Sequence, residues 1–82
     1  MRLILLKSAQ HELDKLPDDI ALRISHKIFD LTKNPYPYGN QKLGGGKGYR
    51  IRIGNYRVVY VVNKSNKTIE ITKIGHRRDV YR

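Results

Sequence analysis

The chain has 82 residues, with 17 Lys and Arg against 7 Asp and Glu, which gives a formal net charge of +10. This length fits a single domain over residues 1–82, and the charge indicates a polyanionic or acidic partner, such as nucleic acid or an acidic protein. The absence of cysteine excludes disulfides, thiol catalysis and thiolate metal sites, and it suits a reducing cytoplasm. No apolar run is long enough for a signal peptide or a membrane span, so no membrane partner is expected.

The first half of the chain predicts one strand followed by a pair of helices. The apolar run over residues 3–6 is typical of a short buried strand, and Ser8 after it fits the N-cap of a helix that begins at Ala9. Pro17 is suited to opening the second helix, because the first turn of a helix needs no N–H from that position. An apolar stripe at helical spacing then follows, made of Ala21, Ile24, Ile28 and Leu31. The stretch "NPYPYGN" ends this helix with two prolines and a glycine.

The second half changes to the period of strands. "QKLGGGKG" indicates a loop, "YRIRI" and "YRVVYVV" indicate two strands around a Gly-Asn turn, and "TIEITKIG" indicates a third. The predicted order is therefore β-α-α-β-β-β. This order predicts an α+β fold in which a small antiparallel sheet carries a helical hairpin on one face.

Positive charge gathers in the sheet half of the chain. No acidic residue lies between Asp30 and Glu70, whereas the helices nearly balance their charges. The basic residues inside this interval are Lys33, Lys42, Lys47, Arg50, Arg52, Arg57, Lys64 and Lys67. This asymmetry favours a basic site over a protein that is merely basic.

The predicted hairpin places arginines together. If Gly54 and Asn55 form the turn, Arg52 lies opposite Arg57, and Arg50 points the same way as Arg52. An opposed pair of cations costs stability unless an anion sits between them. The alternative is that these arginines splay into solvent at a sheet edge, where charge discourages aggregation. A bulge at Gly54 would break the assumed register.

The C-terminal stretch "GHRRDVYR" adds further candidates. Guanidinium groups bind phosphate and stabilise the negative charge of a phosphorane transition state, but they stay protonated and make poor general bases. His76 has a pKa suited to proton transfer, and Tyr81 can serve if neighbouring cations lower its pKa. The alternatives are a solvated histidine and a packing tyrosine.

Other motifs are weak on inspection. "GGGKG" resembles a phosphate-binding loop, but Gly48 stands where that motif needs Ser or Thr, and a strand follows instead of a helix. The three histidines show no metal-ligand spacing, so no metal site and no cofactor are expected. A pair of carboxylates flanking a cleft is also absent, which disfavours glycosidase and two-metal nuclease chemistry.

Three segments together resemble a known family. "SAQHELDKLP", "KLGGGKGYRIRIGNYRVVYVV" and "ITKIGHRRDVYR" are similar to the RelE/ParE toxins of bacterial and archaeal toxin–antitoxin modules, in the same order over nearly the whole chain. The resemblance implies a small cytoplasmic α+β toxin that binds a cognate acidic, RelB-like antitoxin. It also implies a ribosome-dependent mRNA endonuclease, an enzyme that lets the ribose 2′-OH attack the phosphate to leave a 2′,3′-cyclic phosphate without metal.

The resemblance also implies roles for single residues. Arg50 and Arg52 match the basic pair of one strand, Arg57 the arginine of the next, and Arg77 and Tyr81 the arginine and tyrosine of the tail. In the family these residues orient the phosphate, stabilise the transition state and move protons, and His76 is expected to share the last role. The first two positions are often Lys in the family, so Arg50 and Arg52 shift proton transfer towards the tail. The residues expected to grip RNA or the ribosome are Lys42, Lys47, Lys64, Lys67 and Arg78.

Two alternatives share this fold. One is a ParE-like inhibitor of DNA gyrase without RNase activity. The other is an inactive relative that only binds its antitoxin.

Overall fold

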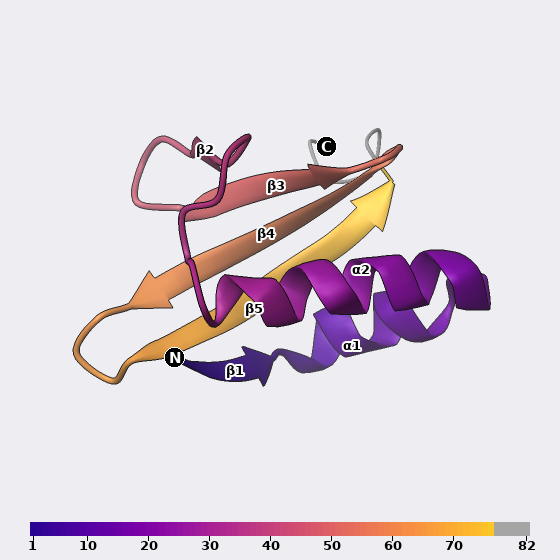
Figure 1. Ribbon diagram of the computed structural model, residues 1–82, viewed down its shortest axis with the longest axis horizontal. Coiled ribbons are helices and arrows are strands. Elements are labelled where there is room, and N and C mark those ends of the chain that lie inside the picture. Colours follow the sequence, from indigo (N-terminus) through magenta and orange to yellow (C-terminus); the bar gives the residue numbers. More distant parts are fainter. Residues whose placement is uncertain (77–82) are drawn as a thin grey trace.

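The computed structural model describes residues 1–76, in which two helices cover one face of a five-stranded sheet (Figure 1). The helices are α1 (Lys7–Asp14) and α2 (Asp18–Leu31). The strands are β1 (Arg2–Leu5), β2 (Gln41–Lys42), β3 (Tyr49–Ile53), β4 (Tyr56–Asn63) and β5 (Thr68–His76). Across the sheet they lie in the order β1-β5-β4-β3-β2.

The α+β class and the predicted order of elements are confirmed, with two corrections to the sheet. The sheet is mixed instead of wholly antiparallel, because β1 pairs with β5 in parallel, from Arg2 opposite Thr68 to Leu5 opposite Ile71. The connection between β1 and β5 is long, since it includes both helices and the strands β2, β3 and β4. It brings the chain back to the end of the sheet where β1 begins, so β5 runs in the same direction as β1. The predicted loop after α2 also begins with the short strand β2, which pairs with β3.

Neither helix begins with a side-chain capping hydrogen bond. The N-cap of α1 is Leu6, which makes no side-chain capping bond, so the predicted cap at Ser8 is wrong. Pro17 is the N-cap of α2, and Asp18 and Asp19 follow in its first turn, where the positive end of the helix dipole favours acids. Neither helix within residues 1–76 is long and apolar enough to cross a membrane.

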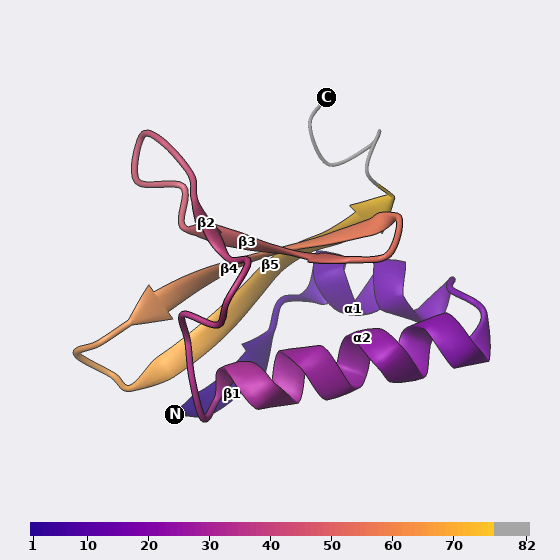
Figure 2. The same ribbon diagram turned by 45° about the horizontal axis from the view of Figure 1, so that its top comes forward.

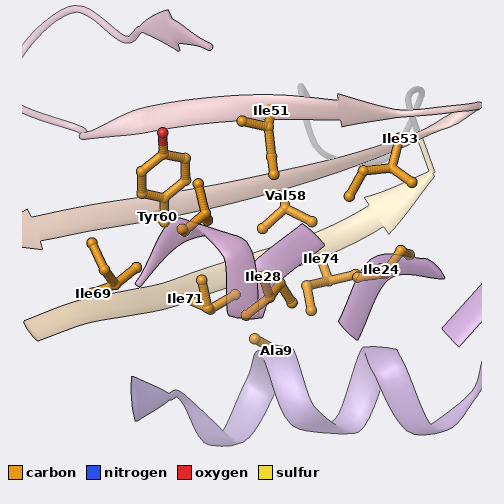
Figure 3. Packing of buried hydrophobic residues seen from close by; sticks show 11 residues of the cluster. Ala9, Ile24, Ile28, Ile51, Ile53, Val58, Tyr60, Ile69, Ile71 and Ile74 are labelled. Carbon is orange, nitrogen blue, oxygen red and sulfur yellow. The ribbon is translucent and has the colours of Figure 1, made fainter. Parts of the chain in front are cut away.

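The core lies between the helices and the sheet (Figure 3). From α2 it takes Ile24, Ile28 and Leu31 of the predicted stripe, whereas Ala21 is only half-buried, and from α1 it takes Ala9. The sheet contributes residues of its three central strands: Ile51, Ile53, Val58, Tyr60, Ile69, Ile71 and Ile74. Burial of each large aliphatic side chain stabilises the fold by about 1.5–3 kcal/mol.

The hairpin of β3 and β4 has the register that the sequence predicts. Gly54 opens the turn with a φ of +59°, a conformation that glycine adopts without strain. Ile53 therefore lies opposite Tyr56, and Arg52 lies opposite Arg57. Gly54 introduces no bulge into this pairing.

A bulge does interrupt the pairing of β4 with β5. Val59 lies opposite Lys73, but the next residue, Tyr60, lies opposite Ile71, so Thr72 is an extra residue in β5. The Thr72 hydroxyl donates a hydrogen bond to the carbonyl oxygen of Val59 at 3.2 Å. Because of this extra residue, Ile71 and Ile74 both reach the core although they are three positions apart.

Candidate functional site

We call the face of the sheet away from the helices, seen in Figure 2, the helix-free face. The register of β3 and β4 places the predicted arginines on it. Ile51 and Val58 are paired and buried in the core, so they point towards the helices. Their neighbours in each strand point the opposite way, because side chains alternate along a strand. Two rows of side chains cross the helix-free face near the β3–β4 turn.

The first row, from β3 to β5, is Arg52, Arg57 and Gly75. Arg52 is exposed, whereas Arg57 is only 3% exposed. Gly75 contributes no side chain, so β5 adds no carboxylate beside Arg57. Arg52 and Arg57 thus lie opposite each other on paired strands, as the sequence predicts.

The buried guanidinium of Arg57 has few partners. Its Nη1 donates a long hydrogen bond of 3.5 Å to the carbonyl oxygen of Tyr56. Its Nε is buried without a hydrogen-bond partner, and Arg57 forms no ion pair within residues 1–76. A buried cation without a counter-charge is costly, and an anion bound at this place would remove much of that cost. The arrangement therefore has the chemistry of an anion site.

The second row is Gln41, Arg50, Val59 and Lys73. Arg50 donates a hydrogen bond from Nη2 to Oε1 of Gln41, which helps to orient the guanidinium. Lys73 is exposed and was not a candidate from the sequence, because regular alternation from Ile71 places it in the core. One signal in the sequence does indicate that Lys73 faces outward. Ile71 and Ile74 are three positions apart, and both can be buried only if a bulge adds one residue between them.

His76 lies beside the first row but in register with a different residue. Its strand partner is Tyr56, and the two ring centres are 5.6 Å apart in an edge arrangement. Tyr56 pairs with the buried Ile53, so His76 shares the helix side of the sheet and not the face of Arg57. Arg77, Arg78 and Tyr81 lie outside the described residues, and the roles expected of them stay predictions.

The lysines expected to bind RNA or the ribosome lie at the other end of the sheet. Lys42 and Lys47 belong to the segment that leads into β3, and Lys64 and Lys67 to the turn between β4 and β5. Figure 1 shows both segments at the end opposite the β3–β4 turn. The Nζ of Lys64 lies 6.0 Å from the ring centre of Tyr36. The structure thus separates these lysines from Arg57, and their role stays a prediction.

Tyr60 holds the segment after α2 against the sheet. Its hydroxyl donates a 2.6 Å hydrogen bond to the carbonyl oxygen of Pro35, and its ring stacks on Tyr49 with 5.8 Å between centres. Burial raises the pKa of Tyr60 to about 12, although a hydrogen bond with Asn40 acts in the opposite direction. Tyr60 is therefore neutral and structural, not a general base.

A cavity of about 410 Å³ lies between α2 and β3, and Arg52 is one of the residues that line it. Lys27 and Asp30 line it together, so cation and carboxylate occur side by side. The helix-free face has the more uniform positive charge and is the better anion site.

Comparisons with known proteins place the chain among toxins. The model of the family described as "ParE toxin of type II toxin-antitoxin system, parDE" matches residues 3–81. The toxin RelG of Mycobacterium tuberculosis is 32% identical over 79 residues, covering 92% of this chain and 88% of the relative. The putative toxin RelE1 of Methanocaldococcus jannaschii is 34% identical over 80 residues, covering 93% and 89%.

Solved structures agree with these sequence relatives. The RelE–RelB complex of Pyrococcus horikoshii contains a chain with a TM-score of 0.82 and 32% identity, covering 95% of this chain and 96% of that one. The RelBE2 toxin–antitoxin complex of Mycobacterium tuberculosis gives a TM-score of 0.81 at 25% identity, covering 93% and 96%.

Proposed function

Because the chain belongs to the RelE/ParE toxins of type II toxin–antitoxin systems, we propose that it is a ribosome-dependent endoribonuclease that cleaves mRNA. The ribose 2′-OH attacks the neighbouring phosphate, the 5′-oxygen of the next nucleotide leaves, and a 2′,3′-cyclic phosphate remains. The reaction moves one proton from the 2′-OH and delivers one to the leaving oxygen.

The observation that carries this proposal is the pair of Arg57 and Arg52 on the helix-free face. Arg57 is buried, its Nε has no hydrogen-bond partner within residues 1–76, and Arg52 is its strand partner across the β3–β4 pairing. A phosphate between them would receive charge-assisted hydrogen bonds from both strands. Donors fixed in place before the reaction stabilise the extra negative charge of the transition state, a contribution of about 10²–10³ in rate for one such group.

Proton transfer falls to other residues in this proposal. Guanidinium groups stay protonated at ordinary pH, so neither arginine acts as the base. His76 shares the face of Tyr56, which favours Tyr81 over His76 as the group that accepts the 2′-OH proton. Arg77, in the same tail, is assigned to the phosphate with Arg57.

The partners in this proposal are the ribosome with its mRNA, and an acidic antitoxin of the RelB type, all in the cytoplasm. The complexes of Pyrococcus horikoshii and Mycobacterium tuberculosis each pair a RelE-type chain with RelB. The formal charge of +10 supports an acidic antitoxin, because such a partner neutralises the toxin. Failure of any acidic protein to co-purify from the native operon would count against this partner.

A translation extract tests the activity. Primer extension on a reporter mRNA is expected to show cuts at fixed positions within codons when the wild-type chain is added. Arg57→Ala and Tyr81→Phe are expected to lose these cuts. Arg23→Ala, which removes an exposed arginine from α2, serves as the matched control and is expected to cut like the wild type.

One competing function is inhibition of DNA gyrase by a ParE-like toxin, and the matching family is described as a ParE toxin. The same extract, supplied with gyrase and plasmid DNA, separates the two functions. Intact mRNA together with trapped gyrase–DNA complexes would establish the gyrase inhibitor. Intact mRNA without trapped complexes would indicate an inactive relative that only binds its antitoxin.

A further inference from the structure

We propose that Arg50 and Lys73, on either side of Val59, form a second phosphate site that holds the mRNA nucleotide next to the cleavage point. This inference rests on the proposed function, because it places a neighbouring phosphate of the same RNA strand. Lys73 is assigned to substrate binding and not to the chemical step, since it lies one row away from the Arg52–Arg57 pair.

The pairing of three strands sets the geometry. Arg50 lies opposite Val59, and Val59 lies opposite Lys73, so all three share the helix-free face. Neighbouring strands are about 4.8 Å apart, which separates the backbones of Arg50 and Lys73 by roughly twice that distance. Both side chains are long enough to converge on one anion from the two sides of Val59, whose apolar side chain forms no hydrogen bond.

The orientation of each cation has a structural cause. Gln41 of β2 accepts a hydrogen bond from Arg50 and helps to orient that guanidinium. The extra residue Thr72 turns Lys73 outward, because without it Lys73 would share the core side with Ile71. Lys73 is exposed, so a phosphate of the RNA backbone can reach it from solvent. Bulges of this kind are common next to active sites, where they redirect a side chain.

The two rows are spaced for neighbouring phosphates of a single strand. Arg50 and Arg52 are two residues apart in β3, which separates their rows by about 6.7 Å. This spacing is large enough for two different phosphates and small enough for them to be consecutive. The mRNA would thus run parallel to β3, with one phosphate between Arg52 and Arg57 and its neighbour between Arg50 and Lys73.

Binding to programmed ribosomes tests the second site without relying on cleavage. The mRNA carries a 2′-O-methyl group at the A-site nucleotide, which blocks the proposed attack and keeps the strand intact. Fluorescently labelled full-length chain is titrated, and its dissociation constant is measured. In parallel mRNAs, an uncharged methylphosphonate replaces one phosphate, either 5′ or 3′ of the blocked position.

Lys73→Ala is expected to weaken binding about two- to fivefold, the upper range for an exposed charge pair. One of the two methylphosphonate mRNAs is expected to weaken wild-type binding by a similar factor and to have no further effect on Lys73→Ala. Lys73→Arg is expected to restore both the affinity and the sensitivity to the methylphosphonate. Lys33→Ala removes the same charge from the end of α2, on the helix side, and is expected to bind like the wild type.

Two results would overturn the inference. One is a Lys73→Ala variant that binds as tightly as the wild type. The other is a loss of affinity from each methylphosphonate that is as large in Lys73→Ala as in the wild type, because Lys73 would then contact neither phosphate. Cleavage of unmodified mRNA on the same ribosomes reports separately on the proposed function. A wild type that binds with the expected coupling but does not cut would contradict the nuclease alone, whereas a wild type that neither binds nor cuts would contradict both.

Discussion

Arg57 keeps a positive charge where the fold would be better served by an apolar side chain. It is 3% exposed, its Nε lacks a hydrogen-bond partner among the described residues, and Arg52 with the same charge lies across from it. Each of these features destabilises the free protein, and each would strengthen the binding of a phosphate. Local structure that is unfavourable for folding is typical of functional sites.

Replacing this charge is expected to raise the stability of the protein and to lower its cleavage activity. Arg57→Met fills the same space without a charge, so the free energy of unfolding is expected to rise by about 1–3 kcal/mol. Loss of the guanidinium is expected to lower the cleavage rate by about 10²–10³. Urea denaturation and cleavage on programmed ribosomes measure the two effects. Arg52→Met, at the exposed partner, is the control and is expected to change stability less; a destabilised Arg57→Met would contradict the cost assigned to Arg57.

Tyr60 offers a second prediction at a single residue. Burial raises its pKa to about 12, above the ordinary value of 10.0, so the folded state holds the proton more tightly than the unfolded state. Its contribution to stability is therefore complete below pH 10 and is lost as the pH rises from 10 to 12.

Tyr60→Phe removes both the hydroxyl and its titration. At neutral pH the variant is expected to lose about 0.5–1.5 kcal/mol of stability, because the carbonyl oxygen of Pro35 loses its hydrogen bond. Its loss of stability between pH 10 and 12 is expected to be shallower than that of the wild type. Tyr38→Phe, at a fully exposed tyrosine, should retain the wild-type slope in urea denaturation followed across this range.

At the scale of elements, the sequence predicts local geometry well. The Gly54–Asn55 turn fixes which residues of β3 and β4 face one another, so the pairing of Arg52 with Arg57 could be predicted from a few neighbouring residues. The apolar stripe of α2 was predictable for the same reason, since its spacing is local.

Features that depend on distant parts of the chain were not predictable in this way. The parallel pairing of β1 with β5 depends on how the helices return the chain, and the sequence of either strand does not encode it. The bulge at Thr72 depends on packing two isoleucines into a core that α2 completes, so Lys73 was missed. The position of His76 also depends on the register of β5 against β4, which pairs His76 with Tyr56 and Gly75 with Arg57.

The loop before β3 gives a prediction at this scale. Gly48 has a φ of +94°, and a Cβ there would lie 2.3 Å from the carbonyl oxygen of Tyr60. Gly48→Ala is therefore expected to destabilise the protein by more than about 1 kcal/mol, through backbone strain and displacement of β4. Gly44→Ala in the same loop meets nothing within 4 Å and is expected to be nearly neutral. Thermal unfolding of the two variants compares them, and equal melting temperatures would contradict the close approach.

For the whole molecule, the net charge of +10 is unevenly distributed. Arginines occupy the helix-free face near the β3–β4 turn, and several lysines lie in the segments at the opposite end of the sheet. Repulsion among these charges destabilises the free protein, and an anion bound at a specific place relieves it more than diffuse screening does.

Phosphate is expected to show this difference. At equal ionic strength, sodium phosphate is expected to raise the melting temperature more than sodium chloride. The free energy of unfolding is expected to rise by about 1 kcal/mol when the phosphate concentration exceeds the dissociation constant several-fold. The advantage of phosphate is expected to disappear in Arg57→Met and to persist in Lys33→Ala. An advantage that is unchanged in Arg57→Met would place the anion elsewhere.

The parallel pairing of β1 with β5 also governs when the protein can become complete during its own synthesis. β1 is translated first, yet its strand partner is not available until residues 68–71 have left the ribosome. The helices and the β3–β4 hairpin can form earlier, but pairing between distant segments is slow and comes late. A nascent chain therefore lacks its finished sheet while its own message is being read. For a toxin proposed to act on ribosomes, this delay would spare the ribosome that makes it.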